Sequence, residues 1–464
     1  MTPISFHDLS HGAAAPESLF ARAVPDLSDF CARAQPIVDA VRLEGDAALR
    51  RFAQAFDGVD DPHMSIRAGE AEFAEAGARV PPDIIRAIQH AGDNIRRFHE
   101  GQKPDEMWMK EIQPGVWAGE RAVPIDSVAC YVPRGKGAFP SVLNMTTIPA
   151  IVAGVPRIAV ITPPGPDGRV DPATLVAARY AGVTEVYKCG GAQGVAAVAY
   201  GTESVPKCLK IVGPGSPWVL AAKRLLANVI DPGIPAGPSE SIILADETAD
   251  GALAALDLLI ESEHGPDSSA FLVTHSRSVA QAALAAIPSY WEQMDSKRAE
   301  FSRSVLTGGA GGIILTRTFA DAISFVNDYA PEHLEILSAE PMSVLGRIRN
   351  AGEVLLGGYT PITLGNYLLG PNAVLPTGRH ARTVSPLSVL DYMKRISVGY
   401  VTKSGYDSLA ADAQRLALYE GFDAHARAVS PLRRKLLGEA IAAPAAPAVE
   451  RKAEWASARP GTPL

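Results

Sequence analysis

The sequence predicts an α/β protein built from two lobes with parallel-type sheets around a cleft, with a helical N-terminal region and a small C-terminal helical appendix. Three observations support this prediction. The chain has 464 residues, which is too long for one compact core. From about residue 128, short apolar runs alternate with helical segments, as in a parallel sheet with helices on its faces. A second series of the same kind starts near residue 241.

The individual elements follow from local patterns. Residues 28–110 are predicted to be helical, with charged faces, and Pro81 and Pro82 suit a helix start because a missing N–H is harmless there. In the first α/β series the predicted strands are Ile158–Thr162, Glu185–Lys188 and Lys210–Val212, and the predicted helices are Asp171–Tyr180, Ala192–Tyr200 and Trp218–Asn228. In the second series the predicted strands are Ser241–Ala245, Phe271–Thr274, Ile313–Thr316, Leu334–Leu337 and Val354–Leu356.

These elements divide the chain into an arm, two lobes, an appendix and a tail. The tail is rich in Ala and Pro and shows no core pattern, so we expect it to be disordered. The predicted parts are an N-terminal arm (1–30), a first lobe from 31–130 with 241–381, a second lobe (131–240), a C-terminal helical domain (382–440) and the tail (441–464).

Composition and charge exclude several classes of partner and compartment. The net charge of −8, without a Lys/Arg block, argues against nucleic acid and gives no reason to expect binding to anionic membranes. The four cysteines form no C-x-x-C pair, so we expect reduced, buried thiols. The N-terminus lacks the basic and apolar regions of a signal peptide, and prolines interrupt the most apolar stretch. A cytoplasmic protein is therefore expected.

Two short segments carry groups suited to chemistry. Glu261 and His264 are three residues apart, so on a helix they share a face and can hold a divalent metal from one side. Glu332 and His333 immediately precede a predicted strand, where a carboxylate can tune a neighbouring imidazole for general-base work. A solvated helix end is the alternative interpretation of the first pair.

Glycine-rich turns follow two predicted strands. Gly190–Gln193 and Gly213–Gly215 each lie between a strand and a helix, where glycine lets a phosphate approach the backbone and the helix N-terminus. The G-x-G-x-x-G fingerprint of dinucleotide-binding folds is absent. Ordinary tight turns therefore remain an alternative.

Together the segments VACYVPRGKGAFPS, GGAQGVAAVAYGTESVP, KIVGPG, IPAGPSE, EHGPDS, APEHL, NAVLPT and SPLSVLDYMKR resemble the histidinol dehydrogenase family in order and approximate spacing, over about residues 30–435. The resemblance implies two Rossmann-like lobes and the oxidation of an alcohol through an aldehyde to a carboxylate with two NAD. It also implies one zinc ion and a homodimer whose active site is completed by the partner's C-terminal segment.

The resemblance also assigns roles to particular residues. It makes His333 the general base and Glu332 the group that activates water for attack on the aldehyde. The metal ligands fall on Glu261, His264, Asn366 and His425. The family has glutamine and aspartate at the first and third of these positions, so an amide and a carboxylate have exchanged places and the formal charge of the ligand set is unchanged.

Other positions are assigned to the cofactor and the substrate in the same way. Ser216 departs from the asparagine that is usual in the family. The implied NAD contacts are Tyr131, Gln193, Gly213, Pro214, Gly215 and Ser216, and the implied substrate contacts are Ser141, Ser239 and Glu420.

The pocket positions favour a substrate other than histidinol. Ile362 and Ala373 replace a glutamate and a histidine that the family uses for histidinol, which removes polar partners for an imidazole. Arg134 and Lys136 add two cations just before Ser141 and suit a small anionic polyol or amino alcohol. They could also bind NAD phosphates or face solvent.

The chain therefore looks most like the branch that oxidises 2,3-dihydroxypropane-1-sulfonate to 3-sulfolactate, the sulfopropanediol dehydrogenases. Two alternatives stay open: histidinol dehydrogenase itself, and a catalytically silent paralogue that binds a small molecule or a protein.

Overall fold

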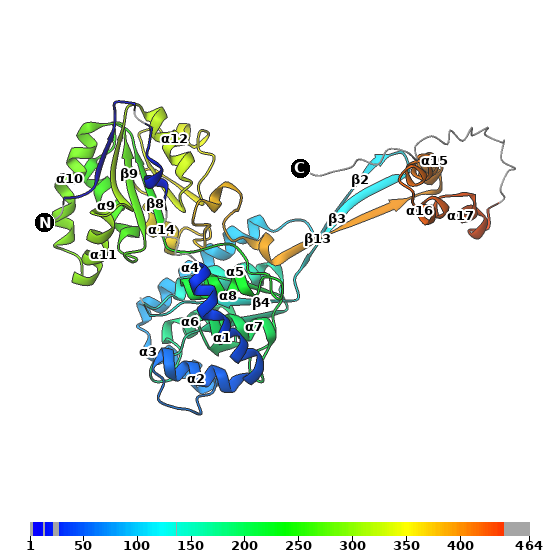
Figure 1. Ribbon diagram of the computed structural model, residues 1–464, viewed down its shortest axis with the longest axis horizontal. Helices are drawn as coiled ribbons and strands as arrows, with labels where there is room; N and C mark the ends of the chain where they lie inside the picture. The colour runs from blue at the N-terminus through cyan, green and yellow to red at the C-terminus, as the bar shows by residue number, and fades with distance from the viewer. Residues whose placement is uncertain (1–2, 13, 22–26, 136, 440–464) are drawn as a thin grey trace, which may run out of the picture. The chain divides into compact units, whose positions relative to one another are not determined.

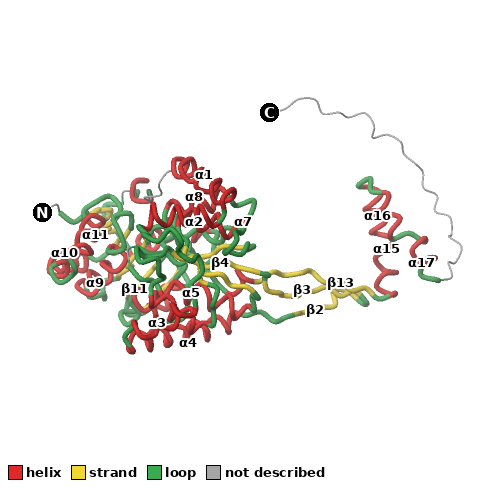
Figure 2. The backbone as a smooth tube through the Cα atoms, turned by 90° about the horizontal axis from the view of Figure 1, so that it is seen from below, coloured by secondary structure: helices red, strands yellow, loops and turns green. Residues whose placement is uncertain are grey.

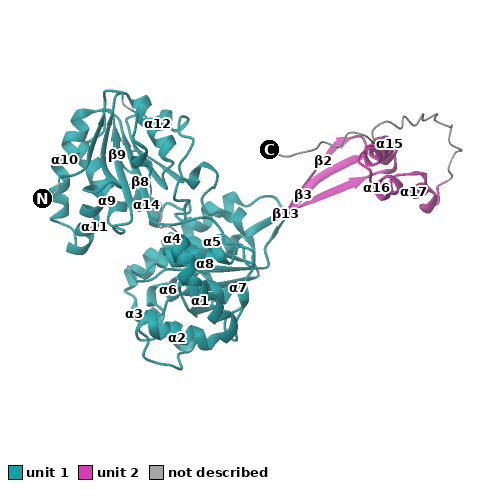
Figure 3. Cartoon of the chain, viewed as in Figure 1, with its two compact units in different colours: residues 1–105, 122–394 teal, residues 106–121, 395–464 magenta. Residues whose placement is uncertain are grey.

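The protein, as a computed structural model, is described for residues 3–12, 14–21, 27–135 and 137–439. Lys136 and the predicted tail of residues 441–464 lie outside the described residues. The chain forms two compact units, of which the first comprises Met1–Asp105 with Ala122–Lys394 and the second comprises Glu106–Arg121 with Arg395–Leu464 (Figure 3).

A four-stranded parallel sheet organises one lobe of the first unit. Its order is β6-β5-β4-β7, with the strands β4 (Ser127–Tyr131), β5 (Arg157–Thr162), β6 (Val186–Lys188) and β7 (Lys210–Val212). Alternate residues face opposite sides: Ala129 and Tyr131 pack with one set of helices, while Val128 and Cys130 pack with the other. Both faces are therefore buried, which accounts for the near-continuous apolar runs of these strands.

Eight helices cover the two faces of this sheet. One face carries α1 (Leu27–Glu44), α2 (Asp46–Asp57), α7 (Gly191–Tyr200) and α8 (Pro217–Leu225), which lie together in Figures 1 and 2. The other face carries α3 (Glu70–Arg79), α4 (Pro82–Gln102), α5 (Pro140–Ala153) and α6 (Pro172–Ala181).

A six-stranded parallel sheet organises the other lobe of the first unit. Its order is β1-β10-β9-β8-β11-β12, with the strands β1 (Phe6–Leu9), β8 (Glu240–Ala245), β9 (Ser269–Thr274), β10 (Gly311–Thr316), β11 (His333–Leu337) and β12 (Glu353–Leu356). One face packs on α9 (Gly251–Ser262), α10 (Arg277–Trp291) and α11 (Ser296–Leu306). The other face packs on η1 (Glu17–Phe20), α12 (Phe319–Tyr329) and α13 (Pro341–Leu345).

Shorter elements complete the first unit. The helix α14 (Ile362–Tyr367) follows β12 and contacts α9. The 3-10 turns η2 (His380–Arg382) and η3 (Val389–Tyr392) come next, and Val389 and Tyr392 of η3 join the core of the four-stranded sheet.

The second unit combines an antiparallel sheet with helices. Its strands β2 (Met107–Gln113), β3 (Val116–Pro124) and β13 (Met393–Val401) are ordered β13-β3-β2, and β2 pairs antiparallel with β3. The helices α15 (Lys403–Tyr419), α16 (Asp423–Ala428) and α17 (Pro431–Leu436) follow in the chain. No helix in the described ranges combines the length and apolar character needed to cross a membrane.

The predicted α/β class with two parallel sheets is confirmed, and every strand predicted in the two α/β series is present within two residues of its predicted bounds. The division into lobes differs from the prediction, because α1–α4 pack on the four-stranded sheet rather than with residues 241–381. The apolar faces of these helices, including Val38, Leu49 and Ile95, cover a sheet that would otherwise be exposed. The end of the predicted helical region, residues 107–110, instead forms the start of β2.

Candidate active site

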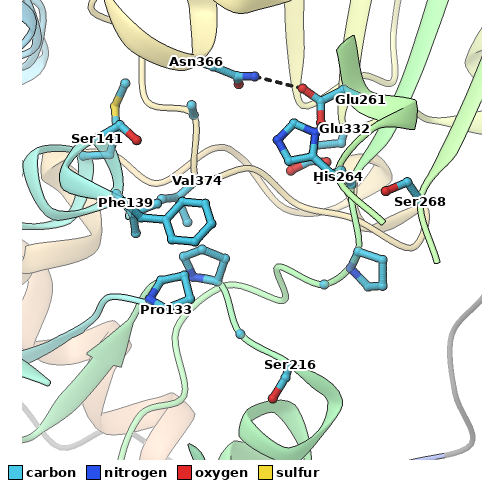
Figure 4. A pocket seen from close by; sticks show the side chains of 18 of the residues that line it. Pro133, Phe139, Ser141, Ser216, Glu261, His264, Ser268, Glu332, Asn366 and Val374 are labelled. Atoms are coloured by element: carbon cyan, nitrogen blue, oxygen red, sulfur yellow. Dashed lines mark hydrogen bonds and ion pairs between the residues drawn. The ribbon is translucent and has the colours of Figure 1, made fainter. Parts of the chain in front are cut away.

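A cavity of about 400 Å³ lies between the two parallel sheets of the first unit. The four-stranded lobe contributes its wall near Pro133, Phe139 and Ser216, and the six-stranded lobe contributes Glu261, His264 and Glu332 (Figure 4). Among the predicted site residues, the cavity is lined by Arg134, Ser141, Pro214, Gly215, Ser216, Ser239, Glu261, His264, Glu332, His333 and Asn366.

The Glu332–His333 pair stands at the start of β11, which lies between β8 and β12. Both side chains are buried. Nδ1 of His333 lies 2.9 Å from Oε2 of Glu353, and Nε2 of His333 lies 3.9 Å from Oε2 of Glu332. The backbone N–H of Glu240 donates to Oε2 of Glu332 at 2.9 Å. The strand order therefore fixes both groups of the predicted catalytic pair.

Burial and neighbouring charges perturb both groups. Burial opposes the charged form of His333, but the carboxylates of Glu332, Glu261 and Glu353 outweigh it and raise the pKa of His333 to about 9. Burial raises the pKa of Glu332 to about 8, with His333 acting in the opposite direction. Such perturbed groups in a cavity are typical of active sites.

A second cluster forms where α9 ends and α14 passes. Nδ1 of His264 lies 3.0 Å from Oε2 of Glu261, and Nδ2 of Asn366 donates to Oε1 of Glu261 at 2.8 Å (Figure 4). Burial disfavours the charge of Glu261, but His264, His333 and the Asn366 hydrogen bond outweigh it, so the pKa of Glu261 lies below its usual value. Glu261 and His264 are in contact, but they do not share a helix face as predicted, because α9 ends at Ser262 and His264 lies two residues beyond it.

The donors in this cluster fit a divalent cation. Nδ1 of His264 is buried and makes no hydrogen bond within the described structure, although a carboxylate oxygen lies beside it. The surrounding buried carboxyl groups exceed the imidazoles in number, which leaves negative charge for a cation to neutralise. In the described part of the chain, no three His, Cys, Asp or Glu side chains gather as a metal site, so the set needs the Asn366 amide and a further ligand.

The turn between β7 and α8 brings backbone to the cavity. Gly213 has a φ of +110°, and a Cβ atom there would lie 2.3 Å from the carbonyl oxygen of Tyr131, so only glycine fits. Nζ of the buried Lys223 donates to the Gly213 carbonyl at 2.9 Å, and burial lowers the pKa of Lys223 to about 8. This turn leads into the N-terminus of α8, which suits a phosphate.

Two of the predicted NAD contacts lie beneath the surface of the same lobe. Tyr131 is buried, and its hydroxyl accepts a hydrogen bond from the N–H of Gly191 at 3.1 Å. Gln193 is buried in the first turn of α7. Tyr131 thus supports the Gly190–Gly191 turn, and neither residue lines the cavity.

The predicted substrate positions show different environments. Ser239 lies within hydrogen-bonding reach of Glu261, and Ala373 lines the cavity, whereas Ile362 is buried in the core of the six-stranded sheet. Arg134 lines the cavity, but its Nη1 donates to the carbonyl of Arg169 at 3.1 Å. One of its guanidinium donors is therefore already engaged within its own lobe.

His425 and Glu420 belong to the second unit. His425 lies in α16, and Glu420 caps the C-terminal end of α15. The structure therefore brings Glu261, His264 and Asn366 together within one unit and places the fourth predicted ligand on the other.

Glu353, the hydrogen-bonding partner of the His333 ring, was not predicted as a site residue from the sequence. The available signal was indirect, because Glu353 precedes the predicted strand Val354–Leu356 as His333 precedes Leu334–Leu337. If those strands pair in parallel, the residues before them become neighbours, and the register does pair His333 with Glu353.

A family model and individual relatives both show similarity of this chain to histidinol dehydrogenases. The model of the family "Histidinol dehydrogenase" matches residues 21–433. A protein of Mesorhizobium japonicum named "Histidinol dehydrogenase homolog 2" is 61% identical over 438 residues, which cover 94% of this chain and 100% of that protein. A "Histidinol dehydrogenase" of Synechocystis is 50% identical over 408 residues, which cover 88% of this chain and 94% of that protein.

The fold agrees with a solved structure. The crystal structure of histidinol dehydrogenase from Elizabethkingia anophelis superimposes with a TM-score of 0.88 and 32% identity, covering 94% of this chain and 99% of that one. The coverage is therefore nearly complete for both chains.

Proposed function

The chain belongs to the histidinol dehydrogenase family, and from this premise we propose that it oxidises a primary alcohol through an aldehyde to a carboxylate with zinc and two NAD. It is an NAD-dependent oxidoreductase that carries out a four-electron oxidation of a CH–OH group. In balance, one alcohol, one water and two NAD⁺ give one carboxylate, two NADH and three protons.

His333 is the proposed general base. Its Nδ1 is engaged with Glu353, so Nε2 of the neutral ring, the form that prevails above about pH 9, is the nitrogen that can take the hydroxyl proton as hydride leaves the neighbouring carbon. In the second half-reaction Glu332, whose nearest oxygen is 3.9 Å from Nε2, holds the water that attacks the aldehyde. His333 then accepts the proton of the resulting hydrate.

Glu261, His264 and Asn366 would hold the metal, with His425 of the partner subunit as the fourth ligand. When bound, the zinc ion would polarise the reacting oxygen, and NAD would accept the hydride. Glu261 is pre-set for this role, because its hydrogen bond to Asn366 and its contact with His264 keep it ionised in a buried position.

The observation that carries the proposal is convergence in one cavity. The Glu332–His333 pair, the proposed metal ligands of the first unit and the β7–α8 turn come from separate stretches of the chain and line the same cavity of about 400 Å³. A silent binding paralogue would have no physical reason to keep a buried charge cluster of this kind, because taking charged groups out of water is costly even when they are paired.

The proposed substrate is 2,3-dihydroxypropane-1-sulfonate, with 3-sulfolactate as the product. Ala373 in the cavity wall and Ile362 in the core offer no polar partner for an imidazole. Arg134 is the one Arg or Lys among the described residues that line this cavity, and a sulfonate needs such a cation because it stays anionic at physiological pH. Histidinol remains the alternative substrate.

The proposed assembly is a homodimer with shared active sites. The second unit exposes large apolar side chains that a partner would cover, including Trp108 at 51%, Tyr419 at 91% and Leu436 at 77% exposure. Because His425 and Glu420 lie on this unit, the same contact would deliver them to the partner's cavity.

A substrate panel tests the proposal. Purified protein loaded with zinc is assayed for NAD reduction with dihydroxypropanesulfonate, histidinol and simple polyols. Turnover of the sulfonate with release of two NADH per molecule is expected. Turnover of histidinol alone would make the chain a histidinol dehydrogenase, and turnover of none of them would support a silent paralogue.

Arg134→Ala tests the sulfonate contact. Loss of a charge-assisted contact should raise KM for dihydroxypropanesulfonate about 10-fold or more, with a smaller effect on KM for NAD. Arg298→Ala is the matched variant, because Arg298 lines an adjoining cavity of about 600 Å³ beside His264. A larger effect of Arg298→Ala on the sulfonate KM would move the anion site there, and an effect mainly on NAD would assign Arg134 to the cofactor.

A further inference from the structure

The ring of His333 is held by a residue from the neighbouring strand. His333 opens β11 and Glu353 opens β12, and the parallel register sets them side by side. The two side chains are 3% and 6% exposed, and the Nδ1–Oε2 distance is 2.9 Å. Water therefore does not compete for this contact, and the distance is that of a charge-assisted hydrogen bond.

Two further contacts restrain Glu353, one at its backbone and one at its carboxyl group. The backbone N–H of Glu353 donates to the carbonyl of Glu332 at 2.9 Å, so one residue anchors both members of the catalytic pair. On the other side α14 passes so closely that a Cβ atom on Gly365 would lie 2.7 Å from Oε1 of Glu353. Gly365 does not have a positive φ, so glycine there provides room rather than backbone freedom.

We infer that Glu353 is a positioning residue for the base: it fixes the tautomer and the plane of the His333 ring. A carboxylate oxygen can only accept, so Nδ1 must carry the proton and Nε2 is the atom left to act. When Nε2 takes a proton, the ring becomes a cation beside an anion that is already in place. Glu353 itself gains and loses no proton in this scheme.

Other polar neighbours of His333 do not have this geometry. Glu332 approaches the Nε2 side, at 3.9 Å, where the reaction occurs. Ser241 pairs with His333 in register from β8, but its hydroxyl makes no hydrogen bond among the described residues. Glu335 lies two residues further along β11 and pairs with Asp257 of α9 instead. The contact with Glu353 is therefore the one that orients the ring.

The inference rests on the proposed role of His333 as the base. The test separates this role from the positioning role of Glu353. The variants are Glu353→Leu, Glu353→Gln, His333→Asn and the double variant, assayed as the zinc-loaded enzyme with dihydroxypropanesulfonate, or with histidinol if that is the substrate turned over. Glu335→Gln is the matched control, because it alters a buried carboxyl group on the same strand that does not contact the ring.

We expect Glu353→Leu to lower kcat about 10- to 100-fold with an unchanged KM for NAD and unchanged zinc content. Glu353→Gln should lose less, because its amide oxygen can still accept from Nδ1. His333→Asn should lose about 10²–10⁴-fold. Adding Glu353→Leu to His333→Asn should lower kcat no further, because no ring remains to be oriented.

The outcomes distinguish the two claims. If His333→Asn retains a wild-type rate, the proposed base is wrong. If His333→Asn is impaired while Glu353→Leu keeps kcat, or if the two losses multiply in the double variant, the positioning role is wrong and the base stands. If Glu353→Leu does not fold, the comparison of Glu353→Gln with Glu335→Gln decides, and equal kcat values for these two would overturn the inference.

Discussion

At the scale of single residues, the molecule concentrates buried ionisable groups on one face of the six-stranded sheet. His333 and Glu335 alternate with apolar residues along β11, so both point toward α9, where Glu261 and Asp257 are one helical turn apart. The carboxyl group of Glu261 lines the cavity, whereas Asp257 and Glu335 do not. The same residue pattern thus supplies both chemistry and a buried acid pair.

The Asp257–Glu335 pair should make stability depend on pH. Burial raises the pKa of Glu335 to about 9, and Asp257 adds to the shift, so the folded state holds a proton that the unfolded chain releases near its usual pKa of 4.5. The stability from this proton is complete below about pH 4.5 and is lost as the pH rises through about 9. Glu335→Gln keeps a neutral hydrogen-bonding group and removes the ionisation.

Relative to Glu335→Gln, the wild-type protein should therefore lose unfolding free energy between pH 5 and pH 9, with a slope of at most about 1.4 kcal/mol per pH unit. Chemical denaturation at several pH values measures this. Glu300→Gln, at an exposed position of α11, is the control and should track the wild type. Parallel curves for wild type and Glu335→Gln would contradict the shared proton.

At the scale of elements, the β7–α8 connection couples a turn to the helix that follows it. Lys223 lies in α8, and its Nζ donates a hydrogen bond to the carbonyl of Gly213 in the turn that precedes this helix. Burying the Lys223 ammonium group costs free energy, which its hydrogen bond to the Gly213 carbonyl partly offsets. We expect this hydrogen bond to hold the turn in one conformation. The turn is thereby kept ready for the cofactor phosphates that we expect there.

Lys223→Met should raise KM for NAD about 3- to 10-fold, because the unpaired carbonyl lets the turn relax, while kcat changes less. Steady-state kinetics with varied NAD provide the measurement. Arg224→Met, at the exposed neighbouring position of α8, is the matched control. Equal KM values for the two variants would show that the lysine does not support the cofactor turn.

The elements also show what the sequence could predict. Fully buried parallel strands such as β9 and β10 appear as short apolar runs, and the three-residue spacing of Glu261 and His264 corresponds to a contact in the structure. The strands β2, β3 and β13 were not predicted, because most of their residues are exposed or half-buried and they show no apolar run. Glu353 required knowledge of strand register, which depends on contacts between distant segments and not on local pattern.

At the scale of the whole molecule, the proposed metal set is divided between two units. Three donors lie in the unit built from the parallel sheets, and His425 lies in the unit built around α15–α17. The sequence resemblance assigned His425 to the site, whereas the sequence itself could not reveal which copy of the chain supplies it.

Hybrid dimers test this division. His264→Ala and His425→Ala should each abolish activity, but a heterodimer of the two restores one intact site. Random mixing by co-expression should therefore return about a quarter of the wild-type activity, since half of the dimers carry one working site of two. Mixtures that stay as inactive as the parents would show that each site uses its own His425.

The two parallel sheets present opposite ends to the cavity. The four-stranded lobe contributes the turn that follows β7 and the first residues of α5 and α8, Ser141 and Ser216 among them. The six-stranded lobe contributes residues at the start of β11, Glu261 in the last turn of α9, and His264 just beyond the end of that helix. Helix beginnings carry partial positive charge and helix ends partial negative charge. The cavity is therefore electrically polar before any ligand arrives: the wall formed by the helix beginnings favours anionic groups, and the opposite wall favours cations.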